Sequence, residues 1–318
     1  MGLNLYICEK YKKMSKILVT GANGQLGKCL KWAVNLKHEY VFVGKDELDI
    51  TNESDIDTFV HGNDYDFIIN CAAYTDVNNC KNDMNAVSVN TIGPMNLAKI
   101  ANRYNIKLIH ISTDYVFNGE KNTPYTEEDE VGPLNFYGIS KLLGEEAVLK
   151  YKMGYVFRTS WLYSIYGKNF LTTIAKRIKN KQNTDVVIDQ IGSPTSARTL
   201  AKFLVWFIDN FEEIGIEPGL YHFSNNGLCS WYDFAVAIED KIKRADYQFG
   251  LIKEGIISPI TTKEYDKKNN LASEQRPAYS VLSNDKIRKY YPNINHWLID
   301  LAEEIRFLGM NDFWGDVQ

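Results

Sequence analysis

Three polar side chains in the first half of the chain have the types and spacing of a proton-transfer site. Tyr137 and Lys141 stand one helical turn apart in YGISK, so a helix would place a phenol and an ammonium group on one face. The Lys141 ammonium group, together with the positive charge of a nicotinamide cofactor if one binds here, should favour the phenolate and lower the pKa of Tyr137. Thr113, just after the apolar run KLIHI, would add a hydroxyl that hydrogen-bonds the substrate oxygen. Such a set suits proton exchange with a carbonyl or alcohol during hydride transfer.

Each of these residues also has a purely structural interpretation. A Tyr-x-x-x-Lys pair occurs by chance on surface helices, and a threonine after a strand commonly satisfies local backbone groups. The occurrence of Thr113, Tyr137 and Lys141 together, in one chain with a cofactor-binding turn, favours the chemical interpretation.

A glycine-rich turn predicts where the cofactor binds. The segment GANGQLG lies between the β-branched run KILVT and a helical pattern. Glycines let the backbone approach a pyrophosphate closely, and a helix N-terminus stabilises its charge. An ordinary glycine-rich turn is the alternative, but the position between strand and helix favours dinucleotide binding. From this turn we expect cofactor contacts by Gly21, Asn23, Gly24, Gln25, Leu26 and Gly27.

The end of the second expected strand bears on the choice of dinucleotide. It reads Gly44-Lys45-Asp46, at the place where an acid would hold the ribose diol of NADH. A small residue followed by a cation leaves room for a 2′-phosphate, whereas Asp46 argues in the other direction. The sequence therefore predicts NADPH or NADH as cofactor and leaves the preference open.

Strand and helix patterns alternate around these residues. Apolar strand patterns occur at 16–20, 40–44, 66–73, 107–112 and 155–161, with helical patterns between them. Alternation at this spacing produces right-handed βαβ units and a parallel sheet. The sequence therefore predicts an α/β protein with a Rossmann-type doubly wound parallel sheet.

The chain divides into three expected parts. Residues 1–13 precede the more natural start MSKILVTG and are interpreted as an N-terminal extension. Residues 14–164 should form the NAD(P)-binding Rossmann domain, with part of 195–250 packing back onto it. Residues 165–318, where the alternation loosens, should form mostly a smaller, mixed α/β substrate-binding lobe.

Composition and charge exclude several classes of partner. The chain has 318 residues, a hydrophobic content of 45%, a charged content of 24% and a net charge of −4, with no block of like charges. This balance argues against nucleic-acid binding and against a basic membrane surface. Five scattered cysteines outside any zinc-binding pattern predict reduced thiols, no metal site and a cytoplasmic location. No apolar run is long enough to span a membrane.

Longer motifs add a family resemblance that runs from about Lys16 to about Leu282. They are GANGQLG (21–27), INCAAYTDV (69–77), NTIGPMNLA (90–98), STDYVFNG (112–119), YGISK (137–141), RTSWLYS (158–164), DQIGSPT (189–195) and RPAYSVL (276–282). Together they resemble the dTDP-4-dehydrorhamnose reductase family, in the extended branch of the short-chain dehydrogenase/reductase superfamily. Generic short-chain dehydrogenases share only the first and fifth of these motifs.

The resemblance implies a reaction and a set of binding residues. The reaction is NAD(P)H-dependent reduction of the C4 ketone of dTDP-4-dehydro-6-deoxy-L-mannose to dTDP-L-rhamnose, the last step of dTDP-rhamnose synthesis for cell-surface polysaccharide. Tyr137 would be the proton donor, and Lys141 would hold the ribose. Further cofactor contacts would come from Lys45, Asp49, Ile50, Ala73, Tyr74, Thr75 and Ile111. Substrate contacts would come from Thr113, Asp114, Trp161 and Arg276.

Two of these substrate contacts are open to another interpretation. Trp161 fits a core aromatic at a strand end as well as a substrate contact. Arg276 is our candidate for the nucleotide diphosphate, because a guanidinium grips phosphate with two hydrogen bonds. Its alternative is a solvated surface arginine.

Tyr115 separates reduction from elimination. Related sugar-nucleotide 4,6-dehydratases read S-T-D-E where this chain reads S-T-D-Y, and their Asp-Glu pair helps to eliminate water. A carbonyl reduction needs a hydride, a proton donor and an oxygen stabiliser, and no additional acid. The tyrosine therefore favours a reductase.

Two other functions remain open, together with the oligomeric state. The chain could reduce another nucleotide-activated keto-sugar, or act as a non-catalytic NADP-binding regulatory subunit resembling that of methionine adenosyltransferase. Some members of the family pair through magnesium held by glutamates, but the corresponding places hold Cys29 and Arg198, which magnesium does not favour. We expect a monomer or a weak homodimer without a magnesium bridge.

Overall fold

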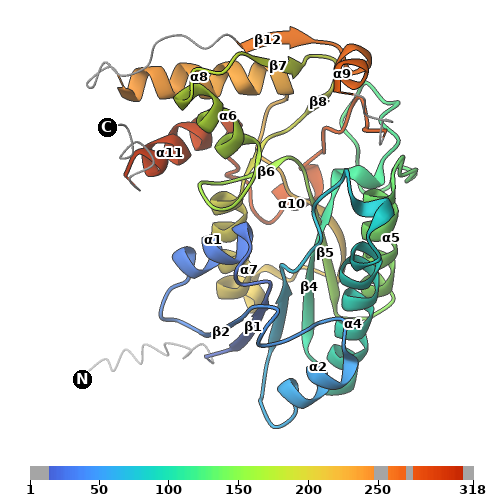
Figure 1. Cartoon of the computed structure of the whole chain (residues 1–318). Coiled ribbons are helices and arrows are strands. Elements are labelled where there is room, and N and C mark those ends of the chain that lie inside the picture. Colours follow the sequence, from blue (N-terminus) through green and yellow to red (C-terminus); the bar gives the residue numbers. More distant parts are fainter. Residues whose placement is uncertain (1–13, 247–256, 270–274, 311–318) are drawn as a thin grey trace, which may run out of the picture.

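The computed structural model describes residues 14–246, 257–269 and 275–310 of the chain (Figure 1). The expected N-terminal extension, residues 1–13, lies outside the described residues. The larger part of the molecule is built on one six-stranded sheet, and a second lobe lies over one end of it (Figure 1).

All neighbouring strands of the main sheet run parallel. Their order across the sheet is β10 (Gly219–His222), β5 (Gly154–Thr159), β4 (Lys107–Thr113), β3 (Phe67–Asn70), β1 (Lys16–Thr20) and β2 (Glu39–Val43). The central strands are apolar runs buried along nearly their whole length, as expected for a sheet covered on both faces. The predicted doubly wound α/β fold is confirmed.

The strand order places a ligand crevice beside β1. From β1 the chain passes to β2 on one side and then returns to β3 on the other side. In open parallel sheets, ligands bind at such a reversal, outside the carboxyl ends of the strands. The segments that follow β1 and β3 therefore face this crevice, as does the Thr113 end of β4.

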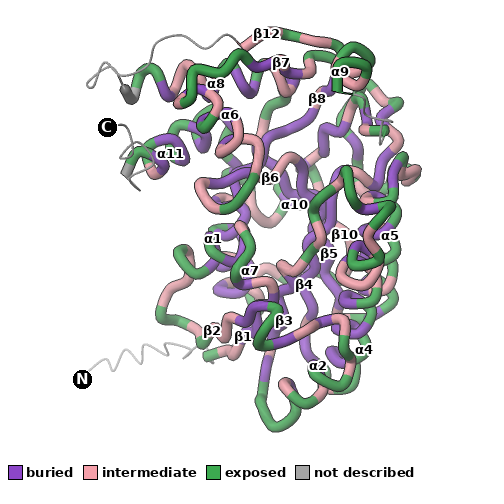
Figure 2. Tube along the Cα trace, viewed as in Figure 1, coloured by how far each residue is buried: buried purple, intermediate pink, exposed green. Residues whose placement is uncertain are grey.

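Helices cover both faces of the sheet. One face carries α1 (Gln25–Ala33) and α7 (Ala197–Ile214), and the other carries α2 (Glu53–Val60), α4 (Gly93–Tyr104) and α5 (Phe136–Leu149). Two separate apolar clusters fill the two interfaces, and Figure 2 shows the strands between them as the most continuously buried part of the chain. Asn52 and Asn135 cap α2 and α5 by accepting hydrogen bonds from first-turn N–H groups.

The second lobe has its own apolar core. Its helices are α6 (Phe170–Lys179), α8 (Trp231–Asp246) and α11 (Trp297–Met310), which pack around one cluster together with β7 (Thr184–Val187). The chain also contains smaller elements, not all of which belong to this lobe. The short strands are β6 (Leu162–Tyr163), β8 (Ile191–Gly192), β9 (Thr195–Ser196), β11 (Cys229–Ser230) and β12 (Ile257–Ile260). The short helices are α3 (Asn85–Val87), α9 (Thr262–Asn269) and α10 (Asp285–Arg288), with helical turns at Cys80–Asn82, Ser88–Ile92 and Asp114–Val116. The elements α7 and β10, although late in the chain, belong to the sheet layer and not to this lobe.

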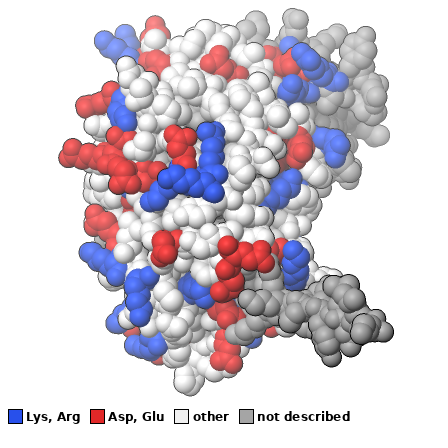
Figure 3. All heavy atoms as spheres, turned by 180° about the vertical axis from the view of Figure 1, so that it is seen from behind, with Lys and Arg blue, Asp and Glu red and all other residues white. Residues whose placement is uncertain are grey.

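The surface carries interspersed charges of both signs on the face seen in Figure 3. Within the described segments, we find no helix with the length and apolar composition needed to cross a membrane. The four described cysteines, Cys29, Cys71, Cys80 and Cys229, are free thiols.

Candidate active site

The glycine-rich turn has the shape and the free donors that a dinucleotide pyrophosphate needs. Gly21 has a φ of +66°, and a Cβ there would come within 2.4 Å of the Ala72 backbone nitrogen. A Cβ at Gly27 would lie 2.6 Å from the Cα atom of Ala22, so α1 packs closely on the turn. Gly24 begins α1 with no side-chain cap and no acid in the first turn. The residues present therefore fit a bound anion at this helix N-terminus.

The side chain of Gln25 joins this turn to the second lobe. Its Nε2 donates to the Leu162 carbonyl at 3.1 Å, and its Oε1 accepts from Ser164 Oγ and from Asn169 Nδ2, each at 3.3 Å. Asn169 also caps α6. The side chain of Gln25 thus joins the turn to the second lobe and is not directed at the expected pyrophosphate.

The end of β2 carries an acid that the sequence interpretation missed. Glu47 folds back so that its carboxylate accepts from the Gly44 N–H at 2.5 Å. Lys45 is exposed beside it. The nearby Asp49 accepts from the N–H and hydroxyl of Thr51, and these hydrogen bonds hold its pKa below the ordinary value. The carboxylate that is hydrogen-bonded to the backbone just after this strand is therefore that of Glu47.

The other residues expected at the cofactor lie on both sides of the crevice. Asn23 packs against Gly44, because a Cβ at Gly44 would lie 2.3 Å from Asn23 Nδ2. Ile50 is buried and packs on the start of α4, where a Cβ at Gly93 would lie 2.5 Å from its Cδ1 atom. Both sides of the expected adenosine site are thus tightly packed.

Asn90 joins the loop after β3 to α5, and sequence reasoning did not single it out. Its Oδ1 accepts from the Tyr74 N–H at 2.8 Å, and its Nδ2 donates to the Tyr74 carbonyl and to Ser140 Oγ, each at 3.0 Å. Asn90 is buried and lies in the π-helical turn Ser88–Ile92, a distortion that is common at functional sites. The expected cofactor residues Ala73, Tyr74 and Thr75 are therefore held in register with α5.

Thr113 and Tyr137 meet at the carboxyl end of β4. The Thr113 hydroxyl lies close enough to the Tyr137 phenol to lower the pKa of that phenol. Thr113 Oγ1 donates to Asp114 Oδ1 at 3.1 Å and accepts from the Tyr115 N–H at 3.2 Å. The two hydroxyl groups predicted to contact one substrate oxygen thus lie side by side.

The pKa of Tyr137 is raised in the protein alone, whereas the lowering expected from sequence includes the charge of a bound nicotinamide. Burial raises this pKa above the ordinary value of 10.0, and the nearby Thr113 hydroxyl only partly opposes this shift. Lys141 Nζ donates to the Ile111 carbonyl at 2.6 Å, so in the protein alone the ammonium is directed at the backbone of β4. A high pKa keeps the phenol protonated, which suits a group that must give a proton during reduction.

Asp114 is the most perturbed carboxyl group of the site. Its side chain is 2% exposed, and burial raises its pKa to about 7, against hydrogen bonds from Ser280 and Thr113. Asp114 therefore changes its protonation near neutral pH. A substrate hydroxyl could meet it as an acceptor or as a donor.

Tyr115 lies between Tyr137 and Arg276. Its ring packs edge-on against Tyr137, with centroids 5.5 Å apart at 80°. Arg276 lies close enough to Tyr115 to lower the pKa of its phenol, and Arg276 Nη2 donates to Asn78 Oδ1 at 3.0 Å. Arg276 is about half-buried, so the structure brings this distant arginine to the rim of the site while part of it stays accessible.

Trp161 is anchored in the second lobe. Its ring stacks on Trp231 with centroids 3.5 Å apart at 5°, and a Cβ at Gly192 would lie 2.3 Å from it. Its backbone has a φ of +46°, a strained value for a large side chain. Such strain is concentrated at functional sites, and Trp161 remains partly exposed. The packing on Trp231 and Gly192 is that of a core aromatic residue. The exposed part of the Trp161 ring is available to a substrate.

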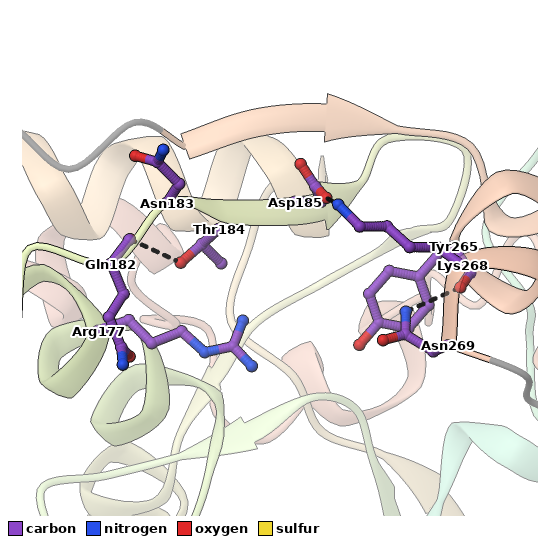
Figure 4. A pocket seen from close by; sticks show the side chains of 8 residues that line it. All are labelled: Arg177, Gln182, Asn183, Thr184, Asp185, Tyr265, Lys268 and Asn269. Carbon is purple, nitrogen blue, oxygen red and sulfur yellow. Dashed lines mark hydrogen bonds and ion pairs between the residues drawn. The ribbon is translucent and has the colours of Figure 1, made fainter.

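A separate hollow lies in the second lobe, between α6, β7 and α9 (Figure 4). Its volume is about 510 Å³, and Asp185 and Lys268 form an ion pair across its wall. None of the residues predicted from sequence lines it. It is therefore distinct from the site around Tyr137.

The two positions considered for a magnesium bridge, Cys29 and Arg198, are engaged in other interactions. The Cys29 side chain is fully buried, and Arg198 Nε pairs with Glu304 Oε1 at 3.1 Å. In the described part of the chain, no three His, Cys, Asp or Glu side chains are grouped as metal ligands.

Comparison with known proteins places the chain in a family. Residues 14–308 match the family described as RmlD substrate binding domain. The chain is 39% identical to the spore coat polysaccharide biosynthesis protein SpsK of Bacillus subtilis, over 92% of this chain and 98% of that protein. It is 38% identical to a dTDP-4-dehydrorhamnose reductase of Aggregatibacter actinomycetemcomitans, over 87% of this chain and 94% of that protein.

Solved structures agree with this placement. A dTDP-4-dehydrorhamnose reductase from Clostridium acetobutylicum has a TM-score of 0.81 and 38% identity, covering 93% of this chain and all of that one. A dTDP-4-dehydrorhamnose reductase from Bacillus anthracis in complex with NADP also has a TM-score of 0.81, at 33% identity, covering 92% of this chain and 99% of that one. Matches of this extent to family, relatives and structures show that the chain belongs to the dTDP-4-dehydrorhamnose reductase family.

Proposed function

We propose that this protein uses NADPH or NADH to reduce the C4 ketone of dTDP-4-dehydro-6-deoxy-L-mannose to dTDP-L-rhamnose, the last step of dTDP-rhamnose synthesis. The observation that carries this proposal is the proximity of Tyr137 and Thr113 at the carboxyl end of β4. This pair lies in the crevice where the order of strands reverses, and family membership supports the same reaction.

The cofactor would lie across the carboxyl ends of β1 and β3. The N-terminus of α1 at Gly24 would hold its pyrophosphate, and the loop at Tyr74 would line its nicotinamide side. When bound, the reduced nicotinamide supplies the hydride. Lys141 would bind its ribose with the donor capacity left beyond the Ile111 carbonyl.

The protein's own contribution is a proton and a stabilised oxygen. Tyr137 stays protonated in its buried setting and gives its proton to the C4 oxygen as charge develops there. The Thr113 hydroxyl supports the same oxygen. Tyr115 occupies the position at which a dehydratase would have its additional acid, so the site supports reduction and not loss of water.

Three residues around this pair would hold the nucleotide sugar. Asp114 lies beside Thr113 and would contact sugar hydroxyls. Arg276, at the rim beyond Tyr115, would bind the diphosphate, and the exposed part of Trp161 would contact the substrate from the second lobe.

A second candidate function is supported by one relative. A protein of Streptomyces niveus named dTDP-4-keto-6-deoxy-D-glucose reductase is 31% identical over 93% of this chain and 98% of its own length. The same catalytic pair would serve this substrate, which differs from the first in the stereochemistry of the sugar. Discrimination would then depend on the second lobe.

We further propose that the enzyme works in the cytoplasm as a monomer, or as a weak dimer without a magnesium bridge. The free thiols support a reducing compartment. The buried Cys29 and the ion-paired Arg198 support the absence of the magnesium bridge.

The decisive experiment follows NADPH and NADH oxidation in parallel, with dTDP-4-dehydro-6-deoxy-glucose in the presence and absence of the 3,5-epimerase. We expect oxidation that depends on the epimerase. Oxidation without the epimerase would favour the second candidate. Cofactor binding without any turnover would overturn both reductases and favour a regulatory subunit.

A matched variant tests the proton donor in the same assay. Tyr137→Phe should lower turnover by about 10²- to 10⁴-fold, as expected for loss of a general acid, with NADPH binding retained. Tyr115→Phe is the control, because it changes a neighbouring tyrosine that we assign no proton. Normal turnover of Tyr137→Phe would remove the assignment.

A further inference from the structure

A chain of buried polar groups lies beneath Lys141, and the reaction proposed above does not use it. Asn70 Oδ1 accepts from Thr20 Oγ1 at 2.7 Å and from the Ala72 N–H at 3.1 Å. Asn70 Nδ2 lies 3.1 Å from His110 Nδ1. His110 Nε2, on the far side of the ring, lies 3.5 Å from Lys141 Nζ. The chain thus runs from the end of β1 through β3 and β4 to the catalytic helix.

The hydrogen bonds of Asn70 determine the tautomer of His110. Two donors converge on Oδ1, one of them a backbone N–H that cannot reverse its role, so the amide orientation is fixed. Nδ2 must then donate to His110 Nδ1. The ring is fully buried, and burial and the Lys141 charge hold its pKa well below 6.5, so it is neutral. With Nδ1 as acceptor, the single ring proton is on Nε2.

This tautomer directs an N–H group at the Lys141 amine. An ammonium group has three donors and no lone pair, so it cannot accept this hydrogen bond. A neutral amine can accept it while still donating to the Ile111 carbonyl. His110 therefore favours the uncharged form of Lys141.

Two other groups near Lys141 could favour its charged form, but neither presents a free negative charge to it. Glu145, on the same helix, has both carboxylate oxygens engaged, by Arg158 and by Ser112 Oγ at 2.7 Å. Cys71, at the end of β3, is a thiol whose pKa burial raises, so it stays uncharged. Burial lowers the pKa of Lys141 to about 8, and Glu145 only partly opposes this shift.

We propose that His110, held as the Nε2–H tautomer by Asn70, is a positioning residue that keeps Lys141 able to gain and lose a proton during turnover. The effect on turnover rests on the proposed function, whereas the effect on Lys141 does not. Failure of the reductase assignment would therefore leave the titration of Lys141 as a separate test.

The first test uses the unmodified protein and needs no substrate. Nitrogen-15 spectra of the histidine rings report the tautomer directly, with His110→Phe identifying the His110 signals. We expect a neutral ring with its proton on Nε2 between pH 6 and pH 8. A proton on Nδ1, or a charged ring, would overturn the proposal.

The second test reverses the tautomer with a change of one functional group. In Asn70→Asp, the new carboxylate still accepts from Thr20 and Ala72 but also accepts from His110 Nδ1–H. His110 Nε2 then becomes an acceptor for the Lys141 ammonium. Carbon-13 labelling of lysine Cε should show Lys141 titrating at least about one pH unit higher, a tenfold change in its acid dissociation constant. An unchanged or lower titration would refute the inference.

His222→Phe is the matched control for loss of a buried neutral histidine. His222 is also fully buried, but its Nδ1 contacts the Tyr125 carbonyl and not Lys141. We expect His110→Phe to raise the pH at which Lys141 titrates and His222→Phe to leave it unchanged. Equal shifts in both variants would mean a general effect of repacking and would contradict the proposal.

The pH profile of turnover completes the test. The basic limb of kcat for NADPH oxidation should move with the Lys141 titration, to higher pH in Asn70→Asp, with little change in the KM for the nucleotide sugar. A limb that stays in place while the lysine titration moves would show that turnover does not depend on this proton. Such a result would overturn the catalytic half of the proposal.

Discussion

Two buried cations of this protein, Lys141 and Arg198, are surrounded in opposite ways. Arg198 pairs with Glu304 at 3.1 Å, and its guanidinium lies over the rings of Phe307 and Trp32, 3.8 Å and 4.2 Å from their centroids. Lys141 contacts a carbonyl oxygen and the neutral His110 ring. Within the described residues, no carboxylate forms an ion pair with it.

The difference distinguishes a structural cation, Arg198, from Lys141, which we propose takes part in the chemistry. Arg198 lies in α7 and contacts residues of α1 and α11, so its charge is compensated where it joins three helices. Lys141 is buried without compensation, which lowers its pKa to about 8, and such perturbed groups are concentrated at functional sites. Removal of the two cations should therefore have opposite consequences.

Lys141→Met gives the largest expected effect, on turnover. The variant removes an uncompensated buried charge, so its thermal stability should be unchanged or higher, while turnover falls by about 10²- to 10⁴-fold, the range for a group that supports proton transfer. NADPH oxidation and thermal denaturation measure the two effects. A large loss of stability with turnover retained would mean that Lys141 is a structural cation like Arg198.

Arg198→Met should give the largest effect on stability. It leaves Glu304 buried without its partner, which typically costs about 3 to 5 kcal/mol. Lys202→Met is the control, because Lys202 lies in the same helix and pairs with Glu303 at 3.6 Å on the surface, where such pairs contribute about 0 to 1 kcal/mol. Urea denaturation of both variants provides the measurement. Similar losses in the free energy of unfolding of both variants would show that burial does not make the Arg198–Glu304 ion pair more important for stability.

Asp114 extends the comparison to a buried anion without a cation. Its pKa is raised from 3.8 to about 7, so its protonated form stabilises the fold at low pH, and this contribution is lost as pH rises through 7. Asp114→Asn should therefore be more stable than the unmodified protein at pH 8, by about 2 to 4 kcal/mol, and close to it at pH 4. Denaturation at the two pH values tests this, and a difference that does not vary with pH would contradict it.

Lys45 is an exposed cation, unlike the buried Lys141 and Arg198, and its substitution should give the smallest of these effects. Lys45→Ala should weaken NADPH about fivefold more than NADH, because a solvated charge near a phosphate contributes about 1 kcal/mol. Glu47→Gln is the opposite variant, since removal of a carboxylate at the same strand end should favour NADPH. Fluorescence titrations with both cofactors give the ratios. Equal losses for NADPH and NADH would refute the role of Lys45.

Much of the site was predictable because its residues lie in local patterns. Alternating strand and helix periodicity predicted the parallel sheet, and the turn at Gly21 to Gly27 predicted the cofactor end of it. Tyr137 and Lys141 are one turn apart, so a helix alone places them on the same face. The family was also visible in the sequence, since its motifs are continuous segments.

The missed features all depend on partners that are distant in the chain. Glu47 was overlooked because its importance comes from the way its side chain folds back onto Gly44. Asn90 acts through Tyr74 and Ser140, which no spacing connects. Tyr137 has a raised pKa because the fold buries it, whereas the sequence showed only a nearby lysine.

The sequence by itself thus determined the sheet and the family, and it predicted the cofactor turn and the proton-transfer residues, because periodicity and short motifs encode local geometry. The tertiary structure alone decided which charges are compensated. Arg198 pairs with Glu304, more than a hundred positions later in the chain, and His110 is oriented by Asn70, forty positions before it. Protonation depends on burial and on such long-range contacts, and these exist only when the chain is folded.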